Sequence, residues 1–145
     1  MITDDVIRRG EVAVVGLGRS GRAVSMLLAR RGATVYASDG GTSHTVREAA
    51  EALRRIGVAV DVGSHDLARI ARVSLAVVSP GIPPTSAPVA AARAAGVPIV
   101  SEVEVALGAL PGARIIAITG TNGKTTTTAL AAHLLSGLGC DAVAA

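Results

Sequence analysis

Two glycine-rich loops constrain this chain more than any other feature. The first loop occupies residues 16–21 and the second occupies residues 120–126. Each loop follows a short apolar run and precedes a helical pattern, which is the context of a phosphate-binding loop. In such loops, small residues let backbone N–H groups converge on an anion, and the helix N-terminus adds partial positive charge. We therefore expect the chain to bind ligands that carry phosphate.

The second loop reads Gly-Thr-Asn-Gly-Lys-Thr-Thr and follows the apolar run at residues 115–118, which we expect to be a strand. Lys124 is placed to bring an ammonium to terminal phosphates, and the Thr125 hydroxyl is placed to ligate Mg²⁺. The chain has thirteen arginines and a single lysine, Lys124. A turn that only caps a helix would not explain this context. The loop departs from the common P-loop, which has glycine where Ile118 stands.

The first loop reads Gly-Leu-Gly-Arg-Ser-Gly and lies between expected strands at residues 11–15 and 34–38. Asp39 follows 18 positions after Gly21. Together these features match the dinucleotide-binding βαβ fingerprint, in which the acidic residue holds a polar part of the nucleoside. A nucleotide-type ligand is therefore expected. On this fingerprint alone, an NAD(P)-binding module of an oxidoreductase is an alternative.

The rest of the chain alternates between strand and helix patterns. Further strands are expected at residues 58–62, 74–78 and 97–101, and helices at residues 42–56, 67–70, 87–95 and 102–110. This alternation predicts an α/β fold with a Rossmann-like, doubly wound parallel sheet. The strand at residues 74–78 leads directly into Ser-Pro-Gly-Ile-Pro-Pro. Such a loop lies at the carboxyl end of a strand, where open α/β sheets bind ligands, so Ser79 and Gly81 are candidate contacts.

The Pro-Gly pair at residues 111–112 predicts a domain boundary. Residues 1–110 would form the Rossmann-like domain. Residues 111–145 would supply only the first strand, phosphate loop and helix of a second α/β domain. One strand and one helix do not bury both faces of a sheet, so we expect a truncated domain whose last 25 or so residues pack poorly.

Composition narrows the class of protein. Half of the residues are apolar but the one aromatic is Tyr36, which suits a sheet covered by helices. No apolar run reaches the roughly 20 residues of a membrane span, and a single cysteine favours a reducing cytoplasm. The net charge is +3, but the arginines are scattered near expected helix ends. We therefore expect a cytoplasmic monomer without nucleic-acid or membrane partners.

Other potential catalytic groups show no pattern typical of chemistry. His44, His65 and His133 have no Cys or His partner at the spacing of metal ligands, and we expect surface or helix-face positions for them. Glu102 and Glu104 would share a face on a strand but not on a helix, so we assign them no chemistry.

The second loop resembles the ATP loop of the Mur ligases, the amide-forming enzymes of peptidoglycan precursor synthesis. Within that family, the first loop with Asp39 and the Val-Ser-Pro-Gly-Ile run at residues 78–82 resemble the D-glutamate-adding branch. The L-alanine-adding branch usually carries His where Asn122 stands and lacks the Ser-Pro-Gly-Ile loop. The resemblance extends from about Val12 to the end of the chain.

This resemblance implies two ligand sites. The first domain would bind the UDP part of UDP-MurNAc-L-alanine through Gly16, Gly18, Arg19, Ser20, Gly21, Asp39, Gly40, Ser79, Pro80 and Gly81. The second loop would bind ATP and Mg²⁺ through Gly120, Thr121, Asn122, Gly123, Lys124, Thr125 and Thr126. Lys124 would act on the β/γ-phosphates and Thr125 on the metal.

The resemblance also implies the reaction. ATP would convert the L-alanine carboxylate to an acyl phosphate, which the amine of D-glutamate would attack. The family's other Mg²⁺ ligands and its D-glutamate-binding domain would lie beyond residue 145, so the fragment is expected to be inactive alone. A third hypothesis is a non-catalytic nucleotide-binding domain built from a ligase-like half.

Overall fold

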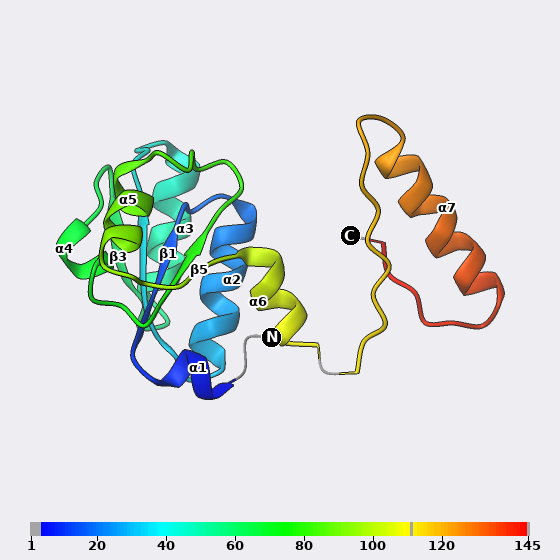
Figure 1. Ribbon diagram of the computed structural model, residues 1–145, viewed down its shortest axis with the longest axis horizontal. Coiled ribbons are helices and arrows are strands. Elements are labelled where there is room, and N and C mark those ends of the chain that lie inside the picture. Colours follow the sequence, from blue (N-terminus) through cyan, green and yellow to red (C-terminus); the bar gives the residue numbers. More distant parts are fainter. Residues whose placement is uncertain (1–3, 111, 145) are drawn as a thin grey trace. The chain divides into compact units, whose positions relative to one another are not determined.

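The computed structural model describes residues 4–110 and 112–144, and the chain divides into two compact units, Met1–Pro111 and Gly112–Ala145. The first unit alternates helices and strands (Figure 1). In chain order its elements are α1 (Asp4–Arg8), β1 (Glu11–Val15), α2 (Arg19–Arg30), β2 (Thr34–Asp39), α3 (His44–Arg54), β3 (Ala59–Val62), α4 (Leu67–Ile70), β4 (Leu75–Val78), α5 (Ala87–Ala94), β5 (Ile99–Ser101) and α6 (Glu102–Gly108).

The five strands form one parallel sheet in the order β3-β2-β1-β4-β5. Val12 of β1 is paired with Val35 of β2 on one side and with Leu75 of β4 on the other. The chain moves outward from β1 to β3 and then crosses to β4 on the other side. This order confirms the predicted Rossmann-like sheet, and it opens a crevice at the carboxyl ends of β1 and β4.

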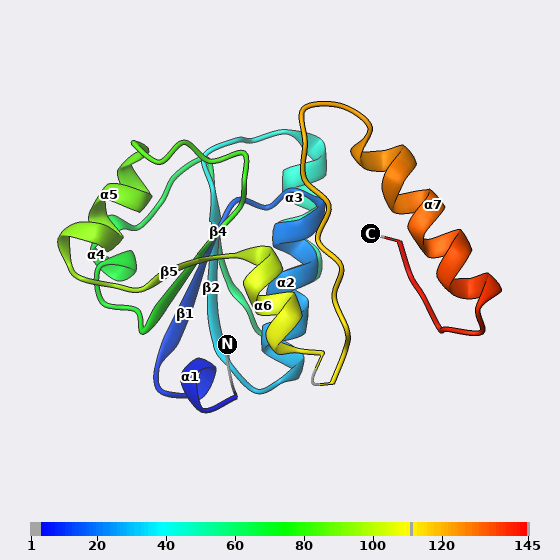
Figure 2. The same ribbon diagram turned by 45° about the vertical axis from the view of Figure 1, so that its right-hand side comes forward.

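Helices cover both faces of the sheet, as Figure 2 shows. Alternate side chains of a strand point to opposite faces. Val12 and Val14 pack in the layer of α2, α3 and α6, whereas Ala13 and Val15 pack in the layer of α4 and α5. Tyr36 is fully buried in this second layer. The remaining core is aliphatic, as the composition predicts.

A short helix that sequence patterning did not predict precedes β1. Helix α1 buries Ile7, which is only 2% exposed. The Arg8 guanidinium donates to the carbonyl of Arg31 at 3.0 Å, just beyond the end of α2. These two contacts attach α1 to the sheet layer that holds α2.

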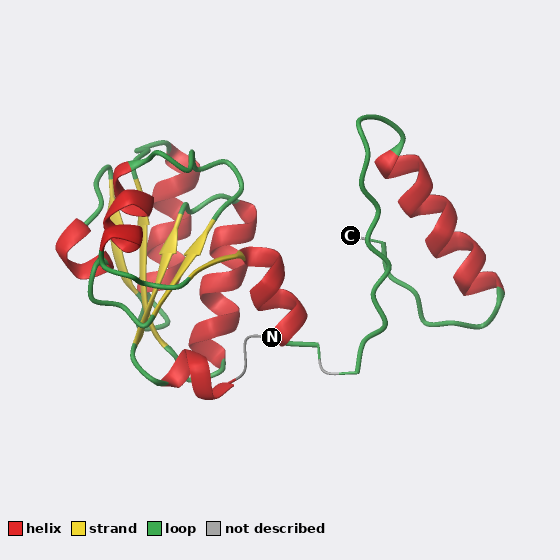
Figure 3. Cartoon of the chain, viewed as in Figure 1, coloured by secondary structure: helices red, strands yellow, loops and turns green. Residues whose placement is uncertain are grey.

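The second unit contains an extended segment and α7 (Lys124–Gly137). Residues 115–118, expected to be a strand, form no described ladder, and Figure 3 draws them as loop. A strand needs a neighbouring strand to satisfy its backbone, and the described part of this unit offers none. Helix α7 buries no side chain, and Ile116 is 64% exposed. The expected poor packing of the last 25 or so residues is confirmed by the exposure of α7.

Across residues 4–110 and 112–144, no helix combines the length and apolar character required to cross a bilayer.

Candidate functional site

The turn from β1 into α2 is tight and favours glycine at its first position. Gly16 has a φ of +101°, a conformation that side chains disfavour. A Cβ at this position would also lie 2.7 Å from the hydroxyl oxygen of Ser79. The Gly16 N–H donates to the carbonyl of Ser38 at 2.8 Å. This residue therefore joins the ends of β1, β2 and β4.

Gly21 allows α2 to touch the end of β1. A Cβ at Gly21 would lie 1.9 Å from the carbonyl oxygen of Gly16, closer than any side chain tolerates. The buried Ser25 hydroxyl donates to the Gly21 carbonyl at 2.7 Å. These contacts give the last glycine of the motif the role of close packing between strand and helix.

The N-terminus of α2 is suited to an anion. Gly18 is the N-cap residue and provides no side-chain cap, so no cap side chain accepts from the first-turn N–H groups. Gly18, Arg19 and Ser20 are all exposed. The partial positive charge of this twelve-residue helix is directed at the same position. A phosphate at this N-terminus would be stabilised by backbone N–H groups and by the helix dipole.

Asp39 at the end of β2 holds two backbone segments in place. Its Oδ2 accepts from the Leu17 N–H at 2.7 Å, and its Oδ1 accepts from the Gly41 N–H at 2.7 Å. The carboxylate therefore shapes the first loop. Each carboxylate oxygen can accept a second hydrogen bond, so a role for Asp39 in ligand contact stays a prediction.

His65 lies beside Asp39 and differs from the expectation of a surface or helix-face histidine. It is half-buried in the turn before α4, with its Nδ1 2.9 Å from the hydroxyl of the buried Ser38. Its Nε2 is 3.4 Å from the position of a Cβ at Gly40. Because Gly40 has no side chain, the His65 ring can lie close to the Gly40 backbone. His44 and His133 are exposed, as expected.

The loop after β4 contributes Ser79. The Ser79 N–H donates to the carbonyl of Val15 at 3.1 Å, which continues the pairing of β4 with β1. The Ser79 hydroxyl donates to the carboxylate of Glu102. Glu102 is only 6% exposed. Sequence patterning did not reveal this structural role of Glu102, whose side chain is built into this edge of the sheet.

Glu104 has a different, local role in the same helix. Its carboxylate accepts from the Ser101 N–H at 2.7 Å, and the Ser101 hydroxyl accepts from the Glu104 N–H at 3.2 Å. This reciprocal capping box begins α6. The hydrogen bond from the Ser101 backbone lowers the pKa of Glu104.

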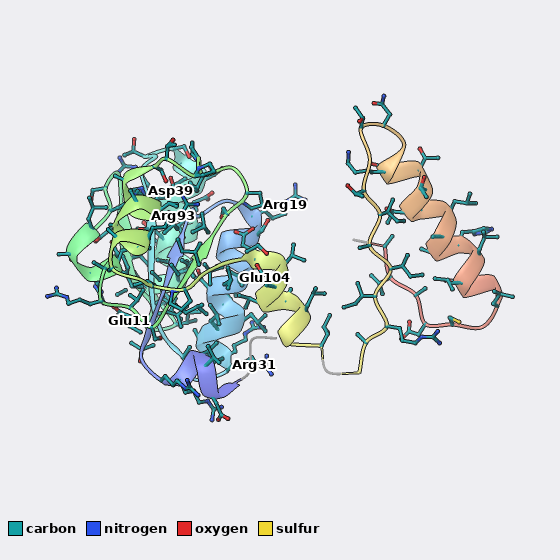
Figure 4. The ribbon with its side chains drawn as sticks, in the orientation of Figure 1. Glu11, Arg19, Arg31, Asp39, Arg93 and Glu104 are labelled. Carbon is teal, nitrogen blue, oxygen red and sulfur yellow. The ribbon has the colours of Figure 1, made fainter. Side chains whose placement is uncertain are left out.

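These loops surround one hollow of about 430 Å³, a size suited to a small ligand. Its lining residues are Gly16, Gly18, Ser20, Gly21, Asp39, Ser79, Pro80, Gly81, Ile82 and Glu102. Most of the predicted contacts of the first site are thus brought together. Arg19 and Gly40 do not line the hollow. Figure 4 shows Arg19 and Asp39 at the same end of the sheet, opposite the end with Glu11 and Arg31.

The second loop is described within its own unit. Gly123 is the N-cap of α7, with a φ of +79° and no side-chain cap. The Lys124 ammonium donates to the carbonyl of Gly120 at 2.6 Å, and Thr125 is exposed. A second, larger hollow in this unit lies between the extended segment and α7, and none of residues 120–126 lines it. The lining includes the exposed apolar side chains of Ile115, Ile116 and Val143, so we attribute this hollow to incomplete packing.

Comparisons with known proteins agree on one family. A family described as "Mur ligase MurD-like, N-terminal domain" matches residues 10–101. A UDP-N-acetylmuramoylalanine–D-glutamate ligase of Acidobacterium capsulatum is 45% identical over 125 residues, covering 86% of this chain and 27% of the relative. The relative of the same name from Paramagnetospirillum magneticum is 42% identical over 150 residues, covering 99% of this chain and 31% of its own.

The sheet is also similar to solved structures. The UDP-N-acetylmuramate-alanine ligase MurC of Thermotoga maritima superposes with a TM-score of 0.61 at 27% identity, covering 90% of this chain and 30% of that one. The chain therefore spans less than one third of the length of these relatives.

Proposed function

Since the chain belongs to the MurD-like family of Mur ligase N-terminal domains, we propose that it is the substrate-binding part of an ATP-dependent ligase of peptidoglycan synthesis. The proposed reaction joins D-glutamate to UDP-N-acetylmuramoyl-L-alanine. The observation that carries this proposal is the hollow at the carboxyl edge of the sheet. The first loop, the loop after β4 and Asp39 all line this hollow. In keeping with the single cysteine, we place the protein in the cytoplasm.

The first loop would hold the diphosphate of the substrate. The first turn of α2 has no side-chain cap and contributes Gly18 and Ser20 to the lining of the hollow, and a Cβ at Gly18 would meet no other described part of the chain within 4 Å. Arg19, at the first turn of α2 and exposed, adds a mobile positive charge. Asp39 would contact the uridine while it holds Leu17 and Gly41 in place.

The second loop would hold ATP and Mg²⁺. The residues fit this role in one respect: the left-handed Gly123 begins α7 without a side-chain cap, which leaves the first-turn N–H groups to an external anion. Lys124 would exchange its hydrogen bond with the Gly120 carbonyl for one with a phosphate oxygen. The exposed Thr125 hydroxyl is available as a metal ligand.

The chemistry sets what the residues must do. A carboxylate is a poor acylating agent. Phosphorylation by ATP would convert one carboxylate oxygen into part of a phosphate, which is a good leaving group. The residues of this chain then orient the substrate and neutralise charge, which is the main protein contribution to phosphoryl transfer. Because the chain spans less than one third of its relatives, we expect it to bind the UDP substrate without completing the reaction.

Calorimetric titration of the 145-residue chain tests this proposal. We expect UDP-N-acetylmuramoyl-L-alanine and UDP to bind and NADH not to bind. Arg19→Ala should weaken UDP binding roughly tenfold, as expected when a charge-assisted hydrogen bond is lost. Arg22→Ala is the matched control, because Arg22 is also exposed on α2 but lies beyond the N-terminal residues that line the hollow.

Selective binding of NADH would contradict the proposal and favour an oxidoreductase module. Equal weakening by the two arginine substitutions would show that the α2 N-terminus does not hold the diphosphate. D-Glutamate-dependent release of ADP by the chain alone would contradict the expected lack of turnover.

A further inference from the structure

One carboxyl group in the wall of the hollow has no place in the proposed reaction. Glu102 is the first residue of α6 and is only 6% exposed, although it lines the hollow. Its Oε1 lies 3.2 Å from the position of a Cβ at Gly21. A buried carboxylate is costly unless it is hydrogen-bonded, so its position beside a proposed anion site requires an explanation.

The partner of Glu102 determines how the wall presents hydrogen-bonding groups. Ser79 donates its hydroxyl hydrogen to the Glu102 carboxylate. A hydroxyl has one hydrogen to donate and two lone pairs to accept with. Gly16 confines the same hydroxyl from the other side, because a Cβ there would lie 2.7 Å from Ser79 Oγ. With its hydrogen engaged, Ser79 has only lone pairs to offer a ligand in the hollow.

The start of α2 contributes groups of the reverse character to the same hollow. Gly18 and Ser20 line it at the start of α2, where N–H groups have no side-chain acceptor from the cap. This part of the lining thus donates hydrogen bonds and favours negative charge. The side formed by Ser79 and Glu102 accepts hydrogen bonds and carries negative charge.

We propose that Glu102 is a positioning residue that fixes Ser79 as a hydrogen-bond acceptor and thereby selects for a donor next to the diphosphate. A sugar hydroxyl or amide N–H can donate a hydrogen bond to the Ser79 hydroxyl. An additional phosphate is instead repelled by the Glu102 carboxylate. The site would therefore discriminate a nucleotide sugar from a nucleoside triphosphate. This inference rests on the proposed function and adds the source of its substrate selectivity.

The test compares the affinities of two ligands for the 145-residue chain. UDP-N-acetylmuramoyl-L-alanine carries a sugar after the diphosphate, whereas UTP carries a third phosphate there. The wild-type chain should prefer the nucleotide sugar. Glu102→Gln should lower the ratio of the two affinities by about tenfold, because the repulsion of UTP by a nearby charge is removed. Thermal unfolding of the variant shows whether the fold is retained.

Glu104→Gln is the matched control. It removes one negative charge from the same helix, but Glu104 is exposed, and in the described part of the chain its carboxylate accepts hydrogen bonds from Ser101 alone. Its affinity ratio should equal that of the wild-type chain. A purely structural role for Glu102 predicts that Glu102→Gln weakens both ligands equally, and an unchanged ratio would overturn the inference.

Ser79→Ala provides a second variant that keeps the Glu102 charge. It should weaken binding of the nucleotide sugar and leave UTP binding as weak as in the wild-type chain. Stronger UTP binding, or no loss of nucleotide-sugar binding, would overturn the inference. If the wild-type chain bound neither ligand, the proposed function would fail together with this inference. If it bound both and neither variant changed the ratio, only the inference would fail.

Discussion

At the scale of single residues, Gly21 is the position where the site tolerates the least change. Gly21→Ala would place a methyl group 1.9 Å from the Gly16 carbonyl oxygen. Because the obstacle is backbone in the loop that lines the hollow, relief would require the first loop to move. We expect a loss of at least about 3 kcal/mol in the free energy of unfolding, measured with urea.

Gly18→Ala is the control for this prediction. Gly18 has a φ of −62° and a ψ of −176°, which any residue adopts, and no atom lies within 4 Å of a Cβ there. The remaining cost is that of alanine at an N-cap, expected to be less than about 1 kcal/mol. Equal destabilisation by the two substitutions would contradict the close packing of α2 on β1.

Glu104 predicts a pH dependence of stability. Its hydrogen bonds with Ser101 lower its pKa from the ordinary value of 4.5, so the native state favours the ionised form. The stabilisation is therefore fully present above that ordinary value and is lost as the pH falls through the lowered pKa. The melting temperature of the wild-type chain should exceed that of Glu104→Gln at neutral pH, and the difference should shrink toward zero in acid. A constant difference would exclude this linkage.

Two residues of the site show what sequence patterning does not capture. Glu102 and Ser79 are 23 positions apart, and no local periodicity relates a helix start to a loop after another strand. His65 likewise meets Ser38 across 27 positions. Glycine motifs can be recognised because backbone geometry restricts them locally. Side-chain pairs that close the site depend on strand order, which places β4 and β5 next to each other.

At the scale of elements, the four-residue helix α4 depends on polar contacts to the sheet. The Asp66 N–H, at its N-cap, donates to the Tyr36 hydroxyl at 2.9 Å, and that hydroxyl donates to Asp61 at 2.8 Å. Burial raises the pKa of the Tyr36 phenol, so it remains a donor at neutral pH. Arg69 of α4 binds both carboxylate oxygens of Glu11 on β1.

Tyr36→Phe should therefore destabilise the chain by about 1–2 kcal/mol, since it leaves the Asp66 N–H and Asp61 without their partner. Urea unfolding measures the loss. Hydrogen exchange should also show faster exchange of the Asp66 amide, with little change at the centre of β1. An unchanged unfolding midpoint would mean that water replaces the hydroxyl without cost.

The sequence predicts elements well where a pattern repeats and poorly where it does not. The five strands and the helices after α1 in the first unit follow from apolar runs separated by glycine turns, because the central parallel strands are buried on both faces. Helix α1 has only five residues, and among residues 5–8 only Ile7 is buried, so the helix produces no period to detect. Residues 115–118 are apolar enough for a strand, but strand formation also requires a paired neighbour.

At the scale of the whole molecule, the two units differ in how well they bury their apolar side chains. The first contains a closed core on both faces of its sheet, and every residue that lines the candidate site belongs to it. In the second, Ile115, Leu134 and Val143 are more than half exposed. Nucleotide-sugar recognition should therefore depend on the first unit alone.

A chain that ends at Pro111 tests this independence. Its hollow retains every lining residue, so it should bind UDP with the affinity of the 145-residue chain and melt at nearly the same temperature. Lys124→Ala in the 145-residue chain is a control for the second loop, because within residues 4–110 and 112–144 the Lys124 side chain hydrogen-bonds to the Gly120 carbonyl alone. This substitution should also leave UDP binding unchanged. A loss of UDP affinity of about tenfold or more on removal of residues 112–145 would show that the second unit contributes to the site.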